Sequence, residues 1–421
     1  MSNRVVIIGG GIIGLSCAYY LSKNGVEVTI LEKDDFANAC SKGNQGWVCP
    51  ALHAPVPEPG LVGTSIKWLM KKDSPLYIKP SAAPRLSGWL TQFMKYCNVD
   101  SFKVGEYALL KLSRSTLDLY DSLEEDGLAF EMHRDGIIFA FLNETELRHK
   151  FDRFQNISKI HGHDIPVMLS GEEVRELEPA ISKDVIGGLW LKKQRHVRPE
   201  TVSKALIEKL ISLGVDLRTK TEVIEIERQG NKVSAVKSSK GRIEGDIFLL
   251  TAGAWSGLLA KELGYSLPVQ GGKGYSITVS NPNLKIHHPL YLGDSKAGIS
   301  PFFGEIRMGG TMELSGINTK LDKNRIQGVR SSVTKYLIEE LHGDMEMEWT
   351  GMRPMTPDGL PVLGQVPNWT NTFVATGHGM VGVAMAPATG KIMADLICQG
   401  STEFDIKSFD PSRFQKAISH S

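Results

Sequence analysis

The chain begins with a short apolar run, a glycine-rich turn and a helical pattern, in that order. Val5–Ile8 is a continuous β-branched run of the kind that a central parallel strand needs when both of its faces are covered. The spacing Gly9-x-Gly11-x-x-Gly14 follows immediately. From Ile12 to Asn24 the apolar residues recur at helical spacing, which predicts a helix that begins inside the glycine turn.

Each glycine of this turn has a physical role. Gly9 permits a tight turn, Gly11 lets a ligand approach the backbone, and Gly14 allows close contact between helix and strand. A second strand, Val26 to Leu31, ends at Glu32, whose carboxylate is placed to accept hydrogen bonds from ribose hydroxyls and to repel a 2′-phosphate. This order of elements predicts a dinucleotide site that disfavours NADP. The glycine motif alone does not separate FAD from NAD.

Composition argues against several classes of protein. The 421 residues include 48 Lys and Arg against 47 Asp and Glu, and no basic run exceeds two residues, so we expect no nucleic-acid partner. The five cysteines show no Cys-x-x-Cys spacing, which indicates no metal site and favours a reducing, cytoplasmic setting. The uncharged stretch from Val5 to Ser22 has the length of a membrane helix, but three consecutive glycines argue against that interpretation.

A long excursion separates this opening from later elements of the same kind. Seven of the 20 prolines lie between Pro50 and Pro84, which indicates an extended crossing between domains rather than a regular element. Leucines at 109, 112, 119 and 123 predict a helix of the second domain that stops at Gly127.

The dinucleotide fold then resumes. A helix over Glu200–Leu213 leads into a strand from Val215, which is another crossover unit. Two hairpin strands, Glu222–Arg228 and Lys232–Ser238, follow, and a buried strand from Ile247 to Thr251 ends in Ala252-Gly253.

Further blocks of sequence resemble a known family. They are SKGNQG at 41–46, EP at 178–179, TAGAW at 251–255, GMRPMTPDG at 351–359, GHG at 377–379 and APATG at 386–390. With the N-terminal motif, they make the chain similar over essentially its whole length to the FAD-dependent D-amino acid oxidase superfamily. The resemblance is strongest to the D-amino acid dehydrogenase (small-subunit type) and glycine oxidase branches, and it implies FAD as the cofactor.

The fold that this resemblance implies is α/β, with an FAD-binding Rossmann-like domain and a discontinuous α+β substrate-binding domain. We expect the FAD-binding domain to comprise residues 1–52, 196–268 and 346–421. The substrate-binding or lid domain is expected to comprise residues 53–195 and 269–345.

Two loops beyond the glycine turn are expected to hold the cofactor. The segment from Ser41 to Gly46 combines hydroxyl and amide donors with small residues, which suits a loop along the pyrophosphate and the flavin edge. Glycines around His378 let the backbone approach a ligand before a helix begins, and the N-terminus of that helix would stabilise negative charge on the flavin pyrimidine. For His378 we expect a structural or flavin-edge role rather than that of a base.

The cofactor contacts expected from motif and resemblance are Gly9, Gly11, Ile12, Ile13, Gly14, Glu32, Lys33, Ser41, Asn44, Gln45, Gly46, Trp47, Val223, Ala252, Gly253, Trp255, His378, Gly379, Met380, Val381 and Gly382. Val223 rests on the resemblance alone, and Trp255 fits simple packing equally well.

Arg353 is the residue expected to bind the substrate. Its planar guanidinium matches a carboxylate, and its apolar neighbours would make an unpaired charge costly. In the resembling enzymes the partner is the substrate carboxylate, whereas a structural ion pair with Asp358 or Glu348 is the alternative. Tyr275 and Tyr291 are further candidates for the same catalytic clamp, with core or lid packing as the alternative.

The predicted function is oxidation of the C–N bond of a D-amino acid or a related secondary amino acid. With the carboxylate on Arg353, hydride leaves Cα for flavin N5, and the imino acid hydrolyses to a 2-oxo acid and ammonia. FAD is expected to be non-covalent, because related sarcosine oxidases attach flavin through a cysteine near the block at 352–354, where this chain has none.

Other functions stay open at this point. The chain could oxidise glycine, sarcosine, hydroxyproline or an opine, serve as the flavin-bearing subunit of an electron-transfer complex, or be an NAD dehydrogenase. The electron acceptor is expected to be oxygen or a quinone or other carrier. A partner subunit, a homo-oligomer and peripheral association with the inner face of the membrane also stay open.

Overall fold

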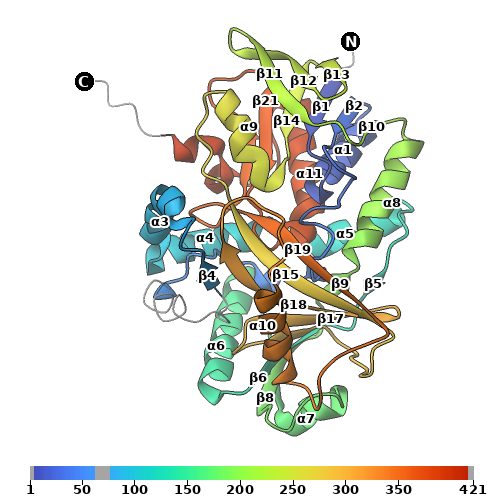
Figure 1. Cartoon of the computed structure of the whole chain (residues 1–421), viewed down its shortest axis with the longest axis vertical. Helices are drawn as coiled ribbons and strands as arrows, with labels where there is room; N and C mark the ends of the chain where they lie inside the picture. Colours follow the sequence, from blue (N-terminus) through green and yellow to red (C-terminus); the bar gives the residue numbers. More distant parts are fainter. Residues whose placement is uncertain (1–3, 62–75, 416–421) are drawn as a thin grey trace.

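The computed structural model describes residues 4–61 and 76–415. One end of the molecule, at the top of Figure 1, holds a mostly parallel sheet with strand order β10–β2–β1–β14–β21–β20. Its strands are β1 (Arg4–Ile8), β2 (Glu27–Leu31), β10 (Asp216–Arg218), β14 (Ile247–Leu250), β20 (Val362–Gln365) and β21 (Thr372–Thr376). Strands from the two ends and the middle of the sequence thus meet in one sheet, which confirms that the dinucleotide fold resumes after an excursion.

Both faces of this sheet are covered. Val5 and Ile7 join a core with α1 (Ile12–Lys23), α8 (Pro199–Ser212) and α11 (Gly382–Gln399). Val6 and Ile8 point the other way, into a core with α9 (Ser256–Glu262) and an antiparallel sheet. The run of apolar residues in β1 is continuous because both faces of the strand are buried, as expected for a central parallel strand.

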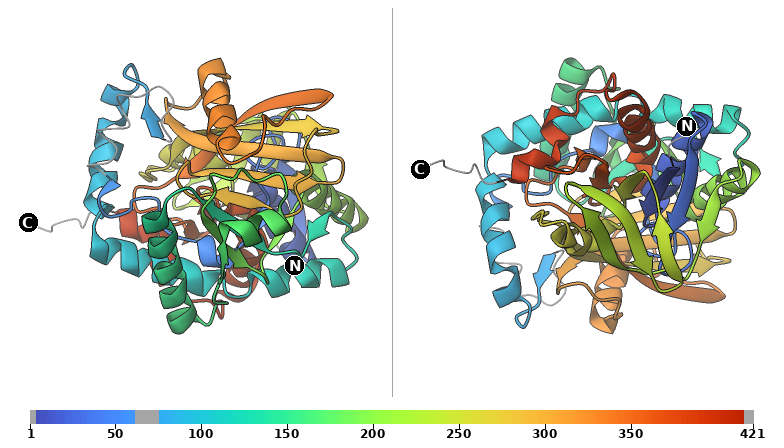
Figure 2. Two further views of the ribbon diagram at one scale, coloured as in Figure 1. Left: turned by 90° about the horizontal axis from the view of Figure 1, so that it is seen from below. Right: turned by 90° about the horizontal axis from the view of Figure 1, so that it is seen from above.

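The antiparallel sheet consists of β11 (Val223–Gln229), β12 (Lys232–Ser238) and β13 (Gly241–Glu244) among the described residues. The turn between β11 and β12 lies at Gly230 and Asn231, as the sequence predicts, and Gly230 has a φ of +63°. The view from above in Figure 2 looks onto this sheet, which lies at the same end of the molecule as the start of β1.

The leucine-rich helix expected in the second domain is two helices, so that prediction was wrong in its extent. They are α4 (Val99–Leu112) and α5 (Thr116–Glu125). The hydroxyl of Ser113 donates to the carbonyl of Leu109 at 2.6 Å, and such competition for backbone acceptors disfavours continuation of a helix. Leu109, Leu112 and Leu123 belong to the same core as Val5, and α5 packs against α11 on that side of the parallel sheet.

The other end of the molecule contains a large sheet of order β19–β15–β18–β17–β16–β6–β8–β7, with β4 paired to β18 (Figure 1). Its strands are β4 (Leu76–Ile78), β6 (Ile137–Phe141), β7 (Val167–Ser170), β8 (Gly187–Leu191), β15 (Gln270–Ser280), β16 (Leu290–Leu292), β17 (Ala297–Phe302), β18 (Glu305–Leu314) and β19 (Met345–Met355). Among the described residues, β3 (Trp47–Val48), β9 (Arg195–Val197) and β5 (Met132–His133) form a small antiparallel sheet in that order.

The two faces of the large sheet differ in character. Residues paired in register share a face, so Gly274 and Gly351 lie on the same face as Gly298 and Gly309. We call this the glycine face. The opposite face carries Ile277, Ile299 and Met308, which pack with α10 (Lys323–Thr334). Near β6 and β8, α6 (Glu144–His161) contributes to the core on the side of the glycine face.

The remaining elements of the described residues are α3 (Ala83–Tyr96), α7 (Gly171–Leu177) and 3-10 turns at Pro50–Leu52, Gly253–Trp255, Lys407–Phe409 and Pro411–Phe414. Part of the proline-rich crossing lies outside the described residues, and the rest includes β4 and the start of α3. The parallel sheet, its helices and the large mixed sheet confirm the predicted α/β fold class. The predicted domain boundaries stay a prediction, and β19, which begins at one of them, pairs with β15 along its whole length.

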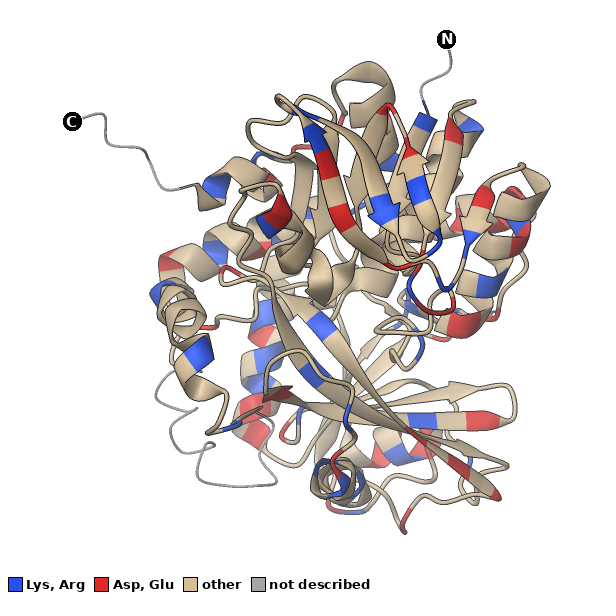
Figure 3. Ribbon diagram, turned by 45° about the horizontal axis from the view of Figure 1, so that its top comes forward, with Lys and Arg blue, Asp and Glu red and all other residues tan. Residues whose placement is uncertain are grey.

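Within the described ranges, no helix combines the length and apolar character that crossing a membrane requires. Lys and Arg are interspersed with Asp and Glu over the ribbon in Figure 3.

Candidate functional site

At two positions of the glycine turn after β1, backbone atoms leave no room for a side chain. Gly9 has a φ of +113°, and a Cβ there would lie 2.7 Å from the carbonyl carbon of Thr251. A Cβ on Gly14 would lie 2.0 Å from the Gly9 oxygen. At Gly11 the nearest atom to such a Cβ is Ser41 Oγ at 3.7 Å. The tight turn and the close contact of helix and strand are therefore confirmed, and the backbone at Gly11 is open to a ligand.

The start of α1 offers unpaired backbone donors. The amide of Ile12 donates to Ser41 Oγ at 3.1 Å. The amides of Gly11, Ile13 and Gly14 have no acceptor in the described part of the chain. Unpaired amides at the N-terminus of a helix bind anions, and the helix dipole favours negative charge there. The turn therefore suits a pyrophosphate.

Glu32 lies beside this turn at the end of β2. Its carboxylate oxygens accept hydrogen bonds from the amides of Gly10, at 2.8 Å, and Asp34, at 2.9 Å. A carboxylate has about four lone-pair positions, so capacity for ribose hydroxyls is left. Lys33, the next residue, lies 3.9 Å from the ring centroid of Trp255, so two other predicted cofactor residues contact each other in a cation–π pair.

The segment from Gly43 to Trp47 crosses the glycine face strand by strand. A Cβ on Gly43 would meet the indole of Trp349, in β19, at 2.2 Å. The Gln45 amide lies over Gly309, in β18, and the Trp47 indole lies over Gly298, in β17, where added Cβ atoms would come within 2.2 and 2.5 Å of these side chains. Trp47 Nε1 also donates to Ser300 Oγ at 2.8 Å, and that hydroxyl donates to Gln45 Oε1 at 2.7 Å.

Asn44 connects this segment to the loop around His378. Its Oδ1 accepts from the amide of Gly46 at 2.8 Å, and its Nδ2 donates to the carbonyl of Met380 at 3.3 Å. Gly46 has a φ of +73°, and a Cβ there would lie 1.8 Å from the Val197 oxygen, so only glycine fits. The two predicted cofactor loops are therefore adjacent in space.

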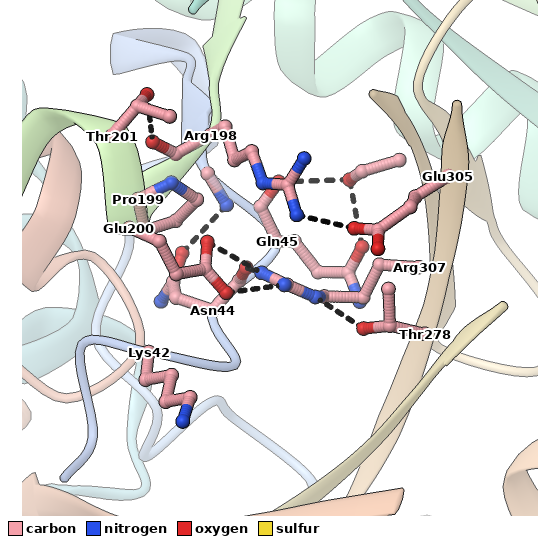
Figure 4. A network of polar contacts seen from close by, with 12 residues as sticks. Lys42, Asn44, Gln45, Arg198, Pro199, Glu200, Thr201, Thr278, Glu305 and Arg307 are labelled. Carbon is pink, nitrogen blue, oxygen red and sulfur yellow. Dashed lines mark hydrogen bonds and ion pairs between the residues drawn. The ribbon is translucent and has the colours of Figure 1, made fainter. Parts of the chain in front are cut away.

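A buried arginine that the sequence analysis missed fixes the same segment (Figure 4). Arg307 is fully buried, and it donates to the Asn44 carbonyl at 2.7 Å, to Glu200 Oε1 at 2.5 Å and to Thr278 Oγ1 at 3.0 Å. It thus joins the segment to the large sheet and to the first turn of α8. The signal was an arginine between two apolar residues of a strand, which only a buried partner for its charge explains.

The loop before α11 also matches the expectation of close backbone packing. Gly377 and Gly379 have φ angles of +81° and +54°, and the amide of Gly379 donates to the Pro354 carbonyl at 2.9 Å. His378 is buried, and its Nε2 lies 2.9 Å from Thr389 Oγ1. Burial lowers the pKa of His378 to about 3, so its ring is neutral. These contacts give His378 a structural partner.

Other predicted cofactor residues lie at neighbouring strand ends. Ala252 and Gly253 directly follow β14, and Thr376, at the end of β21, donates from Oγ1 to the Gly253 carbonyl at 3.0 Å. Val381 and Gly382 lie where α11 begins, and Val223 is the first residue of β11. Their contacts with a cofactor stay a prediction.

Arg353 lies in β19 with its guanidinium on the glycine face. Its Nη1 donates to the Thr311 carbonyl at 2.8 Å, and burial lowers its pKa. The two acids proposed as alternative partners are occupied elsewhere: Asp358 pairs with Arg413 at 2.7 Å and Glu348 with Lys323 at 2.6 Å. No carboxylate in residues 4–61 and 76–415 forms an ion pair with Arg353, so its charge is available to an anionic ligand.

The two candidate tyrosines lie on opposite faces of the sheet. Tyr275 is on the face of α10, fully buried, and donates to Glu313 Oε2 at 2.6 Å, so the structure does not bring it to Arg353. Tyr291 is on the glycine face, paired with Gly298, and its ring centroid lies 6.1 Å from that of Trp47. Burial raises the pKa of Tyr291 to about 12.

A cysteine lies closer to this site than the sequence suggested. Burial raises the pKa of the Cys40 thiol to about 11, an effect that the positive charge of Arg353 partly offsets. The charge of Arg353 therefore acts on the Cys40 thiol, although the two residues are far apart in the chain.

These features fit the two ends of FAD. The unpaired amides of α1 and Glu32 fit the pyrophosphate and the ribose, and the segment at 43–47 with the loop at 377–382 fits a larger planar group between the two sheets. Two observations support the fit to FAD: glycines stand where a Cβ would clash with neighbouring atoms, and the backbone amides of Gly11, Ile13 and Gly14 at the start of α1 have no acceptor among the described residues.

Comparisons with known proteins agree with this assignment. The family model described as DAO, FAD dependent oxidoreductase, matches residues 4–396. A D-amino acid dehydrogenase from Helicobacter pylori is 31% identical over 404 residues, covering 96% of this chain and 97% of the relative. One from Methylobacterium radiotolerans is 31% identical over 408 residues, covering 94% of this chain and 95% of the relative.

Solved structures share the fold. Glycine oxidase from Geobacillus kaustophilus superposes with a TM-score of 0.77 at 22% identity, covering 99% of this chain and all of that one. L-proline dehydrogenase from P. horikoshii gives a TM-score of 0.75 at 21% identity, with 98% of each chain covered. The predicted family, fold class, enzyme class and cofactor are confirmed, and the NAD alternative is set aside. The chain therefore belongs to the DAO family of FAD dependent oxidoreductases.

Proposed function

We propose that this chain is a D-amino acid dehydrogenase that oxidises the C–N bond of its substrate to an imine. Bound FAD supplies the acceptor for the two electrons. Water then hydrolyses the imino acid to a 2-oxo acid and ammonia. Support comes from relatives named D-amino acid dehydrogenase that match along nearly their whole length.

The observation that carries the proposal is the guanidinium of Arg353. It is a charged group in a largely buried position, and it lies on the glycine face, which the segment at 43–47 also covers. Among the described residues its only hydrogen-bond partner is a neutral carbonyl. One donated hydrogen leaves four of the five guanidinium hydrogens for a ligand. A bidentate carboxylate would use two of them and neutralise the charge.

The other side chains bind and orient. Arg353 would hold the carboxylate and thereby fix the Cα–H bond of the substrate relative to the cofactor, which is the positioning contribution to rate. The amides at the start of α1 and the carboxylate of Glu32 would hold the ADP half of FAD. No side chain is assigned the role of general base, since a substrate whose amine is neutral has no proton that must be removed before oxidation.

An anaerobic screen tests the substrate class. The purified protein is mixed with D-alanine, L-alanine, glycine, sarcosine, D-proline and isopropylamine, and the absorption of oxidised flavin is followed. We expect D-alanine or D-proline to bleach the flavin while L-alanine and isopropylamine, which has no carboxylate, do not. Bleaching by L-alanine or glycine in preference to D-amino acids would refute the assignment to D-amino acids. Bleaching by isopropylamine at the rate of D-alanine would refute the carboxylate clamp.

The finer parts of the proposal are the attachment of FAD and the electron acceptor. We infer that FAD is non-covalent, so acid denaturation should release all flavin into the supernatant. Flavin retained in the precipitate would contradict this. If the Cys40→Ser variant then released its flavin, the covalent bond would be at Cys40. We also infer that a quinone or another carrier, rather than oxygen, reoxidises the flavin, because the curated relatives are named dehydrogenases. Reoxidation by air as fast as by a soluble quinone would contradict it.

A further inference from the structure

The backbone beneath Arg353 departs from regular sheet geometry. Lys273 pairs with Glu313 and Tyr275 pairs with Gly310, so two residues of β18, Thr311 and Met312, oppose the single residue Gly274 of β15. This is a β-bulge, which leaves a ladder locally unpaired and changes the direction of backbone groups. From Met312 onward, β18 also has a parallel partner, since Met312 pairs with Leu76 of β4.

Thr311 holds a strained conformation within the bulge. Its φ is +56°, which lies in the left-handed region, where a β-branched residue is a genuine outlier. This conformation costs free energy that the surrounding structure must supply. The side chain does not offset this strain with a hydrogen bond, because Thr311 Oγ1 is buried without a hydrogen-bond partner among the described residues. The carbonyl of Thr311, in contrast, accepts the hydrogen bond from Arg353 Nη1 at 2.8 Å.

Gly274, opposite the bulge, supplies the surface on which the guanidinium lies. A Cβ on Gly274 would come within 2.5 Å of both Cζ and Nη2 of Arg353 and within 2.8 Å of Nη1. Gly274 has no positive φ, so close approach of the guanidinium, rather than backbone conformation, explains the glycine. A methyl group there must move the guanidinium away from the sheet.

We propose that Gly274 and the Thr311 bulge are positioning residues for Arg353: the glycine lets the guanidinium lie flat on the sheet, and the bulge directs a carbonyl that fixes its rotation. The remaining donors are then presented to the substrate carboxylate in one orientation. This inference rests on the proposed function in that Arg353 binds the carboxylate. Guanidinium–carboxylate recognition is bidentate, so the affinity for the carboxylate depends on the orientation of the guanidinium as well as on its charge.

The test measures binding of propionate, a carboxylate without an amine, to the FAD-loaded protein by calorimetry. Gly274→Ala is the test variant. Gly271→Ala is the matched control, because it adds the same methyl group to the same strand, where the nearest atom is the flexible Met352 sulfur at 2.8 Å. We expect Gly274→Ala to weaken propionate binding by about tenfold or more, and Gly271→Ala to change it by less than about twofold.

A double-mutant cycle separates positioning from a general effect on the sheet. If Gly274 acts through Arg353, Gly274→Ala should change propionate affinity less than about twofold in an Arg353→Ala background, while each single variant weakens it. FAD content should be normal throughout. Equal weakening by Gly274→Ala with and without the arginine, or no weakening in the single variant, would overturn the inference and leave the carboxylate clamp standing. Unchanged affinity in Arg353→Ala alone would overturn both.

A second pair of variants tests the bulge itself. Deletion of Thr311 would make the β15–β18 ladder regular and remove the carbonyl that Arg353 uses, whereas Thr311→Gly keeps the carbonyl and relieves the strain. We expect the deletion to weaken propionate binding by about tenfold, and Thr311→Gly to retain affinity within about twofold with a raised Tm. A Thr311 deletion that keeps its FAD and binds propionate as tightly as wild type would show that the bulge does not position Arg353. If the deletion does not fold, the Gly274 cycle decides the inference.

Discussion

The hydroxyl of Tyr275 donates to Glu313 Oε2 at 2.6 Å on the face of the large sheet that points away from Arg353. Glu313 also lies 3.1 Å from Lys273 Nζ, and that ammonium donates to the Asn318 side chain at 2.8 Å. Burial works against ionisation of Glu313, but hydrogen bonds from Ser315, Tyr275 and Lys273 outweigh it and lower its pKa. Tyr275 therefore completes a buried, charged cluster.

Tyr275→Phe should lower the free energy of unfolding by about 1–3 kcal/mol, because it removes a hydrogen bond to a buried charge. The kcat/KM of the enzyme should change little. Tyr291→Phe is the control, since the Tyr291 hydroxyl has no hydrogen-bond partner in the described ranges. Urea denaturation and steady-state kinetics measure the two effects. A Tyr275→Phe variant with normal stability and reduced kcat/KM would contradict this structural role and indicate that Tyr275 acts on the substrate.

Glu32→Ala should weaken FAD binding by about ten- to a hundredfold. The carboxylate is expected to pair with ribose hydroxyls, and such charge-assisted hydrogen bonds contribute about 1.5–3 kcal/mol. It also accepts from the Gly10 amide, so its loss loosens the glycine turn. Asp34→Ala is a matched control, because it removes a neighbouring carboxylate and keeps the Asp34 amide that donates to Glu32. Titration of the apoprotein with FAD gives both affinities, and equal affinity in Glu32→Ala and wild type would make Glu32 a surface acid.

The order of elements around the glycine turn was predictable because local rules determine it. The continuous β-branched run of β1, the glycine spacing and the position of Glu32 each follow from burial on both faces and from close backbone approach. The leucine-rich helix was mispredicted because its apolar period continues across Ser113, where a side chain competes for the backbone acceptor and the helix ends. Periodicity reports which residues face a core, and it does not report where a helix is interrupted.

His378 predicts a dependence of stability on pH. Burial lowers its pKa from an ordinary value near 6.5 to about 3 in the folded protein, so between these values the unfolded chain binds a proton that the folded chain does not. Stability from this residue is therefore complete above pH 6.5 and is lost as the pH falls toward 3, at up to about 1.4 kcal/mol per pH unit. His53 and His196, with pKa values lowered by burial to about 3 and about 4, act in the same direction.

Urea denaturation between pH 6.5 and 4.5 isolates this contribution. His378→Asn removes the titrating ring and leaves His53 and His196 in place, so its free energy of unfolding should fall with decreasing pH less steeply than that of wild type. The comparison uses slopes, so a constant loss of stability in the variant does not affect it. Parallel slopes in the two proteins would mean that the folded protein accommodates a protonated His378.

The substrate site was predictable only in part, because side-chain direction in a sheet depends on register. Arg353 was identified from its chemistry and its apolar neighbours. Tyr275 and Tyr291 looked equivalent in sequence, yet alternation along β15 and β16 places them on opposite faces. Arg307 and the Thr311 bulge were missed because their significance lies in contacts with segments more than 40 residues away. The apolar neighbours of Arg307 indicate a buried charge, but they do not identify its partner.

Arg353 gives the most direct test of the substrate site. Arg353→Lys keeps the charge and loses the two-pronged geometry, while Arg353→Ala loses both, so kcat/KM toward a D-amino acid should fall in that order. Loss of a partner from a bound charge costs about 2–5 kcal/mol, which predicts that the alanine variant is slowed at least about thirtyfold. FAD content should stay normal.

The control for this series is Arg330→Ala. Arg330 pairs with Glu346 at 2.6 Å, at the far end of the strand that carries Arg353, so its loss removes a guanidinium from the same region without touching the site. Its kcat/KM should stay within about twofold of wild type. Any slow residual oxidation of amines without a carboxylate should have the same rate in Arg353→Ala and in wild type, because the missing charge has no partner in them. If the Arg353 variants instead lose FAD and stability together, or slow amines and amino acids equally, Arg353 is a structural residue and Tyr291 becomes the next candidate on the glycine face.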